Sequence, residues 1–302
     1  MKTEKGSVTA DVTNEEWGKI RSARRGLLVY FAILIPLTTI GYLTAMQIEL
    51  FILLLMWAPG LSAICARLLL REGMADISLR IRGRQMMKTL PFILLFPVGI
   101  GLFAYGFAWV TGMVQFVTPD TFVNASPAVT FTVLLVMQMV VGTLVGLIGS
   151  AGEELGWRGY MLTRLIDARV PYPMLTSGIV WGLWHLPVIL AGNYYSGPYP
   201  ALSVILFMIT ITAFSLIIGR LRLVTGSVWP AIFLHASWNA VIQDVFDASS
   251  SGNNALLWTG ESGILVALAL VVAAWIINKR SPFFTNLGGG WLNGNGGNQK
   301  II

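Results

Sequence analysis

Charged residues are scarce in this sequence of 302 residues. Asp, Glu, Lys and Arg make up only 11% of it, while hydrophobic residues make up 55% and the mean hydropathy is +0.72. Soluble domains carry roughly 25% charged residues, so the composition excludes an ordinary soluble protein and predicts an integral membrane protein. The net charge of +6 then informs orientation in the bilayer, and we expect no nucleic-acid partner.

The sequence also lacks a second cysteine and an early apolar stretch. The single cysteine, Cys65, forms no intramolecular disulfide or cysteine-based metal site, and we expect a small core side chain. The polar start predicts no signal peptide, so the first apolar segment should remain as a span. The expected organisation is a cytoplasmic N-terminal segment (1–25), a transmembrane domain (26–280) with its motif-bearing core at 128–245, and a disordered Gly/Asn-rich tail (281–302).

Long apolar stretches dominate the rest of the chain. A transmembrane helix needs about 20 mostly apolar residues, and eight stretches approach or reach that length. The sequence therefore predicts an all-α polytopic membrane protein with about eight transmembrane helices. The predicted spans are 26–47, 50–70, 90–112, 128–151, 173–191, 200–219, 227–245 and 262–278.

Basic residues are absent from one set of connecting segments. With eight spans, all 20 Lys and Arg residues fall on the side of the termini, if Arg67 extends outward from the end of its span. Basic loops are typical of the cytoplasmic side, so both termini are predicted to be cytoplasmic. The segments without Lys or Arg are 47–50, 112–127, 191–200 and 245–261.

Histidine is limited to two residues, and each lies in a predicted span. His185 lies in WGLWHLP and His235 in LHASWN, on spans that begin on the predicted cytoplasmic side. Two adjacent carboxylates, Glu153 and Glu154, lie at the cytoplasmic end of the fourth span. The three groups can meet at a site open to the cytoplasm if the fourth helix continues past Arg158.

The two glutamates are expected to have different roles. Residues four apart share a helix face, whereas adjacent residues point about 100° apart. Glu154 and Arg158 should therefore form an ion pair that supports the helix. Glu153 should face the bundle interior, where desolvation raises the pKa of a carboxyl group and makes it a better general base near neutral pH.

The histidines have partners at the same spacing. His235 and Asn239 project from one helix face as two hydrogen-bonding groups. Trp181 and His185 share a face of another helix, so the indole can form a wall against the imidazole. We expect these two pairs to converge with Glu153 at one site.

This set of side chains predicts a hydrolase. Glu and His can deprotonate a water, and a second His with Asn can stabilise an oxyanion, which suits hydrolysis of an acyl or amide bond without a covalent nucleophile. Glu153, His185 and His235 also form a His₂Glu set of the kind that binds zinc, although the zinc-protease string HExxH is absent. The residues leave direct Glu/His catalysis and zinc-assisted catalysis open.

Other interpretations of the same residues exist. A histidine in a span can simply join two helices, and a Glu-Glu string at a helix end can be a solvated face. A proton-coupled transporter uses Glu and His as a relay, but we find no further acid deep in the other spans. A noncatalytic membrane immunity or scaffold protein would use the polar cluster for packing. The combination of all the groups favours an enzyme.

The ordered motifs EELGWR (153–158), WGLWH (181–185) and HASWN (235–239) resemble the CPBP family of intramembrane proteases. That family includes the CAAX prenyl endopeptidases and the bacteriocin-processing and immunity proteins. Its pattern is EExxxR, then FxxxH, then HxxxN or HxxxD, on separate transmembrane helices. Trp181 replaces the usual Phe and keeps an aromatic wall. The resemblance covers about 150–245.

The resemblance implies an eight-helix, multi-pass protease with a cavity open to the cytoplasm, in the cell membrane if the source is a prokaryote. The implied substrate is a peptide or a lipidated protein, including a prenylated CAAX-type protein. The family mechanism is described both as metal-dependent, with zinc, and as metal-free. The resemblance implies that Glu153 and His185 activate the water and that His235 and Asn239 stabilise the oxyanion. Glu154, Arg158 and Trp181 are the implied supporting residues. If a zinc ion is bound, its implied ligands are Glu153, His185 and His235.

Overall fold

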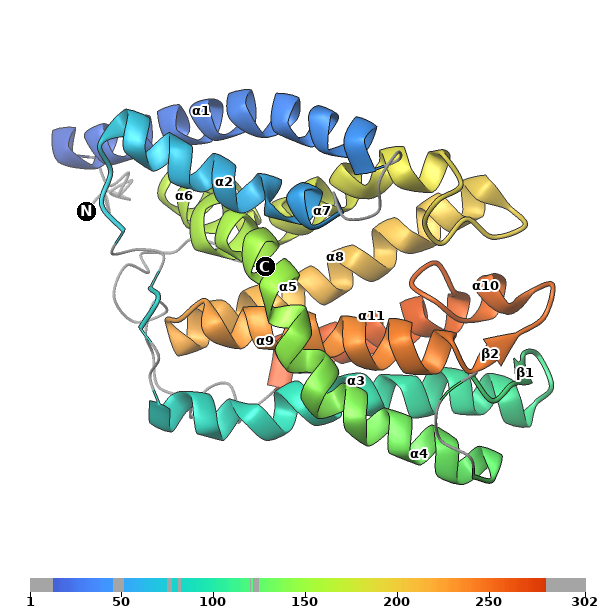
Figure 1. Ribbon diagram of the computed structural model, residues 1–302. Coiled ribbons are helices and arrows are strands. Elements are labelled where there is room, and N and C mark those ends of the chain that lie inside the picture. The colour runs from blue at the N-terminus through green and yellow to red at the C-terminus, as the bar shows by residue number, and fades with distance from the viewer. Residues whose placement is uncertain are drawn as a thin grey trace, which may run out of the picture.

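The computed structural model describes residues 13–45, 52–74, 78–80, 83–119, 121 and 125–280. The predicted tail (281–302) and the first twelve residues lie outside the described residues. Most of the described chain is helical (Figure 1). Short π-helical segments are named η. The elements are α1 (Asn14–Ala45), α2 (Ile52–Leu70), α3 (Gly83–Val110), β1 (Gln115–Phe116), α4 (Pro127–Met137), η2 (Gln138–Gly142), α5 (Thr143–Gly156), η3 (Trp157–Met161), α6 (Leu162–Asp167), α7 (Pro173–Leu190), α8 (Pro200–Thr225), α9 (Trp229–Trp238), η4 (Asn239–Asp247), β2 (Ser250–Ser251), α10 (Ala255–Trp258) and α11 (Ile264–Arg280).

Each of the eight predicted spans coincides with a helical segment, and the all-α polytopic bundle is confirmed. Six helical segments of the described chain are long and apolar enough to cross a membrane, including the continuous run Pro127–Asp167. The other two predicted spans are not among these six. They correspond to α11, with 17 residues, and to α9 continued by η4.

The fourth predicted span continues far beyond its expected end. Helical structure runs from α4 through η2, α5 and η3 to the end of α6 at Asp167. The helix thus continues past Arg158, which is the condition under which the three motifs were expected to meet. It moves Glu153 and Glu154 from the expected end of a helix to the middle of one.

Prolines and a glycine mark several helix boundaries. Pro127, Pro173, Pro200 and Pro230 occupy the first turn of α4, α7, α8 and α9. Proline is favoured there because its fixed φ suits a helix and the first amide hydrogens have no partner within the helix. Gly226 ends α8 with a φ of 62°, a left-handed conformation that glycine adopts without steric cost.

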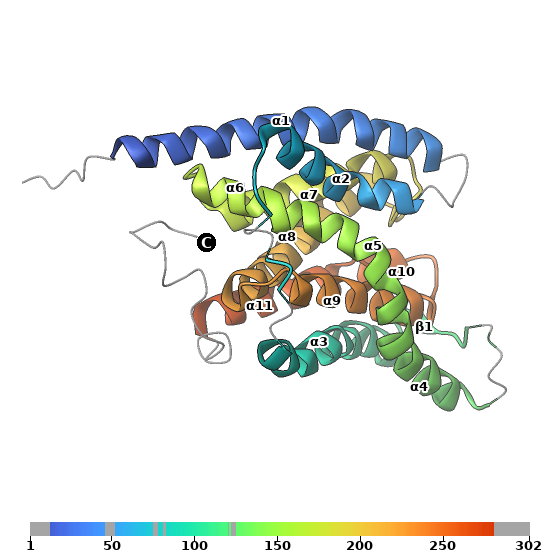
Figure 2. The same cartoon turned by 60° about the vertical axis from the view of Figure 1, so that its left-hand side comes forward.

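The helices form a bundle that α5 crosses obliquely. In Figures 1 and 2, α1 and α2 lie along one side of the molecule, α3 lies along the other, and α8 lies between them. α2 and α9 both pack against α5, while α8 packs against α7 and α11. α5 therefore brings its side chains to the centre of the bundle, between α2 and α9.

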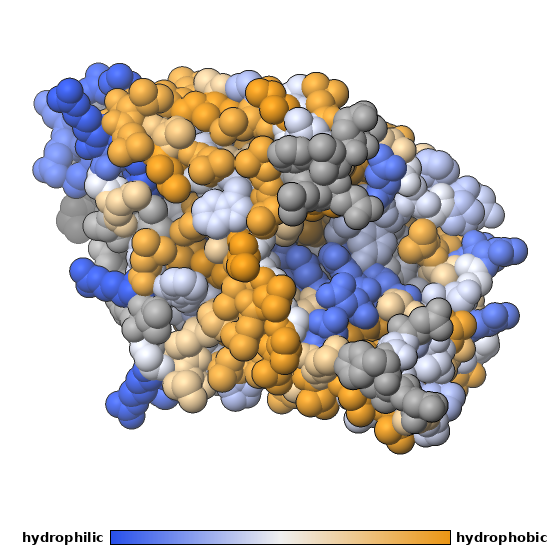
Figure 3. Space-filling view, in the orientation of Figure 1, coloured by the Kyte–Doolittle hydropathy of each residue, from blue (hydrophilic) through white to orange (hydrophobic). Residues whose placement is uncertain are grey.

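The outer surface is strongly apolar. Large hydrophobic side chains are exposed on several helices, among them Leu28 on α1 (73%), Val145 on α5 (65%) and Leu190 on α7 (71%). Figure 3 shows hydrophobic residues over much of one face. Soluble proteins rarely expose large contiguous apolar patches, so this surface is suited to contact with lipid.

Glycine allows α2 and α5 to approach closely next to the two glutamates. A Cβ added to Gly152 would lie 2.7 Å from the Cα of Trp57, and one added to Gly60 would lie 2.6 Å from the carbonyl oxygen of Gly152. Small residues at a helix–helix contact let backbones pack directly. The contact accompanies deep burial of Glu153 and Glu154, which are 3% and 0% exposed.

We predict that Gly152→Ala destabilises the protein by about 1–3 kcal/mol, because overpacking forces the α2 and α5 backbones apart. The melting temperature in detergent micelles measures the effect. The matched control is Gly99→Ala on α3, where an added Cβ meets nothing within 4 Å. The control should keep or slightly raise the melting temperature. Equal melting temperatures for the two variants would contradict the close contact.

Candidate active site

The three sequence motifs converge on one cavity. It has a volume of about 470 Å³, and its polar lining includes Glu153 from α5, His185 from α7, His235 from α9 and Asn239 from η4. The predicted convergence is confirmed. Figure 3 shows hydrophilic residues gathered around a hollow in an otherwise largely hydrophobic face.

Glu154 connects two of the motifs. Its Oε1 accepts hydrogen bonds from Nη1 of Arg158 at 2.6 Å and from Nδ1 of His235 at 2.9 Å. The predicted ion pair with Arg158 is therefore confirmed, and the contact with His235 is an additional one. All three side chains are buried, so the pairing fixes α5 and η3 relative to α9.

The pairing also determines which nitrogen of His235 serves the cavity. A carboxylate paired with a guanidinium accepts hydrogen bonds and does not donate them. Nδ1 of His235 must therefore carry the hydrogen in its contact with Glu154. The remaining ring nitrogen, Nε2, is the one available to a molecule in the cavity.

His185 is oriented by a backbone contact. Its Nδ1 lies 2.9 Å from the carbonyl oxygen of Trp181, and a carbonyl oxygen only accepts hydrogen bonds. Nδ1 therefore carries the hydrogen, and in the neutral ring Nε2 is an acceptor. The rings of Trp184 and Tyr194 lie against the imidazole, with centroids at 4.8 and 5.8 Å.

Trp181 contributes more than the predicted aromatic wall. Its ring lies edge-on to both imidazoles, with centroids 5.9 Å from that of His185 and 5.2 Å from that of His235. Its Nε1 also donates a hydrogen bond to Oε2 of Glu153 at 2.8 Å. The guanidinium of Arg158 lies 4.2 Å from the centroid of the same ring. Trp181 thus holds the carboxylate of Glu153, a role that aromatic character alone does not indicate.

Further polar residues of the cavity belong to no recognised motif. Tyr194, Gln243 and Glu261 line it together with the predicted residues. Glu261 is only 4% exposed, although it ends a segment expected to lie outside the bilayer. One sequence signal was available, because Gln243 lies four residues after Asn239 and so shares its helix face.

The residues do not form a metal site in this arrangement. Among the described residues, no group of three His, Cys, Asp or Glu side chains is placed to hold a metal ion. Oε2 of Glu153 and Nδ1 of His235 are engaged by Trp181 and Glu154, which leaves Oε1 of Glu153 and Nε2 of His235 as the atoms that a ligand could meet. Glu153, His185 and His235 line one cavity but are not close enough together to form a set of three metal ligands as they lie here, and zinc stays a prediction from the sequence.

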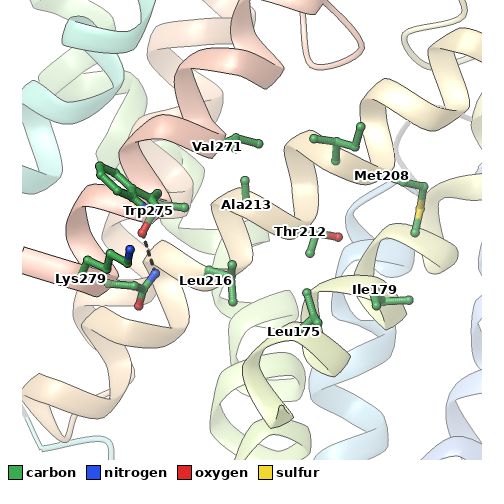
Figure 4. A pocket seen from close by; sticks show the side chains of 12 residues that line it. Leu175, Ile179, Met208, Thr212, Ala213, Leu216, Val271, Trp275 and Lys279 are labelled. Carbon is green, nitrogen blue, oxygen red and sulfur yellow. Dashed lines mark hydrogen bonds between the residues drawn. The ribbon is translucent and has the colours of Figure 1, made fainter. Parts of the chain in front are cut away.

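A second cavity contains no such chemistry. It has a volume of about 650 Å³ and lies between α7, α8 and α11, lined mainly by apolar side chains with Lys279 at one edge (Figure 4). No carboxylate or histidine is among the described residues that line it. It is therefore not a candidate for hydrolysis.

The segment that carries the three motifs also matches a known protein family. Residues 131–241 match a family model described as "Type II CAAX prenyl endopeptidase Rce1-like". The predicted resemblance is confirmed. The Rce1-like segment extends from α4 into η4 and includes Glu153, His185, His235 and Asn239, whereas Gln243 and Glu261 lie after it.

One curated relative supports the same resemblance. It is described as "CAAX prenyl protease 2" of Methanococcus maripaludis and is 30% identical over 153 residues, which are 47% of this chain and 51% of the relative. The chain thus spans about half the length of the curated relative that it matches.

We predict that Arg158→Met destabilises the protein by about 3–5 kcal/mol, because it leaves the buried carboxylate of Glu154 without its cation. Thermal unfolding in micelles measures the loss. Arg169→Met is the matched control, since Arg169 pairs with Glu16 at 2.9 Å but both side chains are over 40% exposed. An exposed pair contributes little. The account fails if the two substitutions lower the melting temperature equally.

Proposed function

We propose that the protein is an intramembrane endopeptidase that hydrolyses a peptide bond of a prenylated CAAX-type protein or peptide. The observation that carries the proposal is the single cavity in which Glu153, His185, His235 and Asn239 meet. The Rce1-like match of residues 131–241 supports the class of reaction. In both histidines Nδ1 is engaged and Nε2 is left for a molecule in the cavity.

The proposed base is Glu153. Trp181 donates to Oε2 of Glu153, which leaves Oε1 to accept a hydrogen bond from a water. Nε2 of His185 is a second acceptor for the same water, because its Nδ1 hydrogen is directed at a carbonyl oxygen. Two acceptors orient the water with its lone pair toward the carbonyl carbon, and Glu153 takes its proton as the carbon–oxygen bond forms.

His235 and Asn239 are the proposed oxyanion donors. A His235 that carries both ring hydrogens donates from Nε2, and Glu154 supplies the compensating charge at Nδ1. The side-chain amide of Asn239 supplies the second donor. Hydrogen bonds directed at an oxygen that becomes negative stabilise the transition state more than the bound substrate.

The proposed reaction balances with water as the sole co-reactant. The tetrahedral intermediate collapses as its carbon–nitrogen bond breaks and the proton held by Glu153 passes to the leaving amine. The products are a carboxylic acid and an amine, and Glu153 returns to the carboxylate form. Every step uses side chains that line the cavity.

The lining of the cavity suits a lipidated peptide. α1 and α2 add an apolar wall to the cavity that includes Tyr42, Leu55 and Met56. An amphipathic substrate can place its lipid against that wall and its peptide bond against Glu153.

The basic segments of the sequence support termini on the cytoplasmic side. The cavity, however, is lined by Ala45, Tyr194 and Glu261, which lie at or next to the connecting segments without Lys or Arg. Cytoplasmic termini and a cavity open to the cytoplasm, both expected from the sequence, therefore do not fit together.

We predict that Glu153→Ala, His185→Ala and His235→Ala each lower kcat by about 10²- to 10⁴-fold, because each removes a group that acts on the water or the oxyanion. The protein is reconstituted in phospholipid vesicles with a farnesylated Cys-a-a-X peptide. Mass spectrometry of the released fragments measures the rate.

The matched control is Glu15→Gln, which removes a carboxylate that is 80% exposed near the start of α1 and should leave kcat unchanged. Melting temperatures identify any variant that fails to fold. Wild-type rates in all three folded alanine variants would overturn the proposed function.

A further inference from the structure

A hydrogen-bonded cluster outside the recognised motifs lies beside Asn239. Nε2 of Gln243 is 3.3 Å from Oδ1 of Asn239 and 3.1 Å from Oε1 of Glu261. The same nitrogen is 3.1 Å from the hydroxyl oxygen of Tyr194. The four residues all line the cavity and come from three separate parts of the chain.

Glu261 is held rigidly within this cluster. Nε1 of Trp238 donates to its Oε1 at 2.7 Å, and the Tyr194 hydroxyl donates to its Oε2 at 2.8 Å. Trp238 precedes Asn239 in the chain, and Tyr194 stacks on His185 with an interplanar angle of 24°. The carboxylate of Glu261 therefore connects the two sides of the candidate site.

The cluster fixes the direction of the Asn239 amide. An ionised carboxylate only accepts hydrogen bonds, so the group of Gln243 that faces Glu261 must be its NH₂. The two hydrogens of that NH₂ are shared among Glu261, Tyr194 and Asn239. Because an amide nitrogen does not accept hydrogen bonds, the Asn239 atom that faces it is the acceptor, Oδ1. The donor of Asn239, Nδ2, is consequently turned away from Gln243. Nδ2 is the atom that an oxyanion requires.

We propose that Gln243 and Glu261 are positioning residues that hold Asn239 with its Nδ2 directed at the oxyanion. The proposal rests on the proposed hydrolysis and adds two residues that lie beyond the Rce1-like segment. Glu261 orients Gln243, and Gln243 orients Asn239. Neither needs to touch the substrate for this effect.

The test is a double-mutant cycle on the farnesylated Cys-a-a-X peptide in phospholipid vesicles. Asn239→Ala should lower kcat by about 10²- to 10³-fold, as expected for loss of one oxyanion donor. Gln243→Leu should lower kcat by about 10- to 100-fold with KM changed less than about two-fold, because Asn239 loses its orientation and binding is retained. The double variant should be no slower than Asn239→Ala, since Gln243 acts through Asn239.

A second variant tests Glu261 separately. Glu261→Gln is nearly isosteric, but its amide can donate as well as accept, so it no longer dictates which group of Gln243 faces it. It should also lower kcat at nearly constant KM, with no further loss on the Asn239→Ala background. The control is Asp244→Asn, which removes one negative charge next to Gln243 at an exposed position of η4. The control should keep the wild-type kcat.

The outcomes separate the two proposals. A wild-type kcat in folded Gln243→Leu and Glu261→Gln, or in Asn239→Ala, overturns the positioning role while the hydrolase stands. Losses that multiply in the double variants also overturn it, because they show an effect independent of Asn239. Absence of cleavage by the wild-type protein, with its melting transition intact, overturns the proposed function and the positioning role together.

Discussion

The buried carboxylate of Glu154 is the constraint on which the rest of the site depends. It accepts hydrogen bonds from Arg158 and His235 in a place that water does not reach. A buried charge is costly unless it is paired and hydrogen-bonded, so η3 and α9 must lie where their side chains reach it. This requirement fixes Nδ1 of His235 and leaves Nε2 for the cavity. The adjacent Glu153 points in another direction along the helix, where Trp181 holds it at the cavity wall.

Two of the motifs lie where an α-helix becomes a π-helix. η3 begins at Trp157, between the glutamates and Arg158, and η4 begins at Asn239. A π turn adds a residue to the turn and changes the direction of the side chains that follow, and such turns frequently occur at functional sites. In this protein they occur beside the ion pair and the proposed oxyanion donor. The π turns therefore help to set the direction in which Arg158 and Asn239 project.

Local geometry made much of this predictable from sequence. Four-residue spacing predicted the contact between Glu154 and Arg158, and apolar length predicted the helices. Contacts between distant segments were not predictable in this way: Glu154 meets His235 across 81 residues, and Glu153 meets Trp181 across 28. The predicted spans left 245–261 as a connecting segment without Lys or Arg, but the sequence gave no sign that Glu261 returns into the cavity. That return depends on partners such as Trp238 and Tyr194, which the sequence presents only as hydrophobic residues.

The central claim is that two neighbouring glutamates divide structure and chemistry between them. The most direct measurement compares Glu153→Gln with Glu154→Gln, recording both the melting temperature and the kcat for a farnesylated Cys-a-a-X peptide. The account predicts that Glu153→Gln keeps the wild-type melting temperature and loses cleavage, because a carboxamide is not a base. It predicts that Glu154→Gln lowers the melting temperature, because Arg158 is left buried without its counter-charge. Wild-type cleavage by Glu153→Gln, or a wild-type melting temperature in Glu154→Gln, would contradict the division.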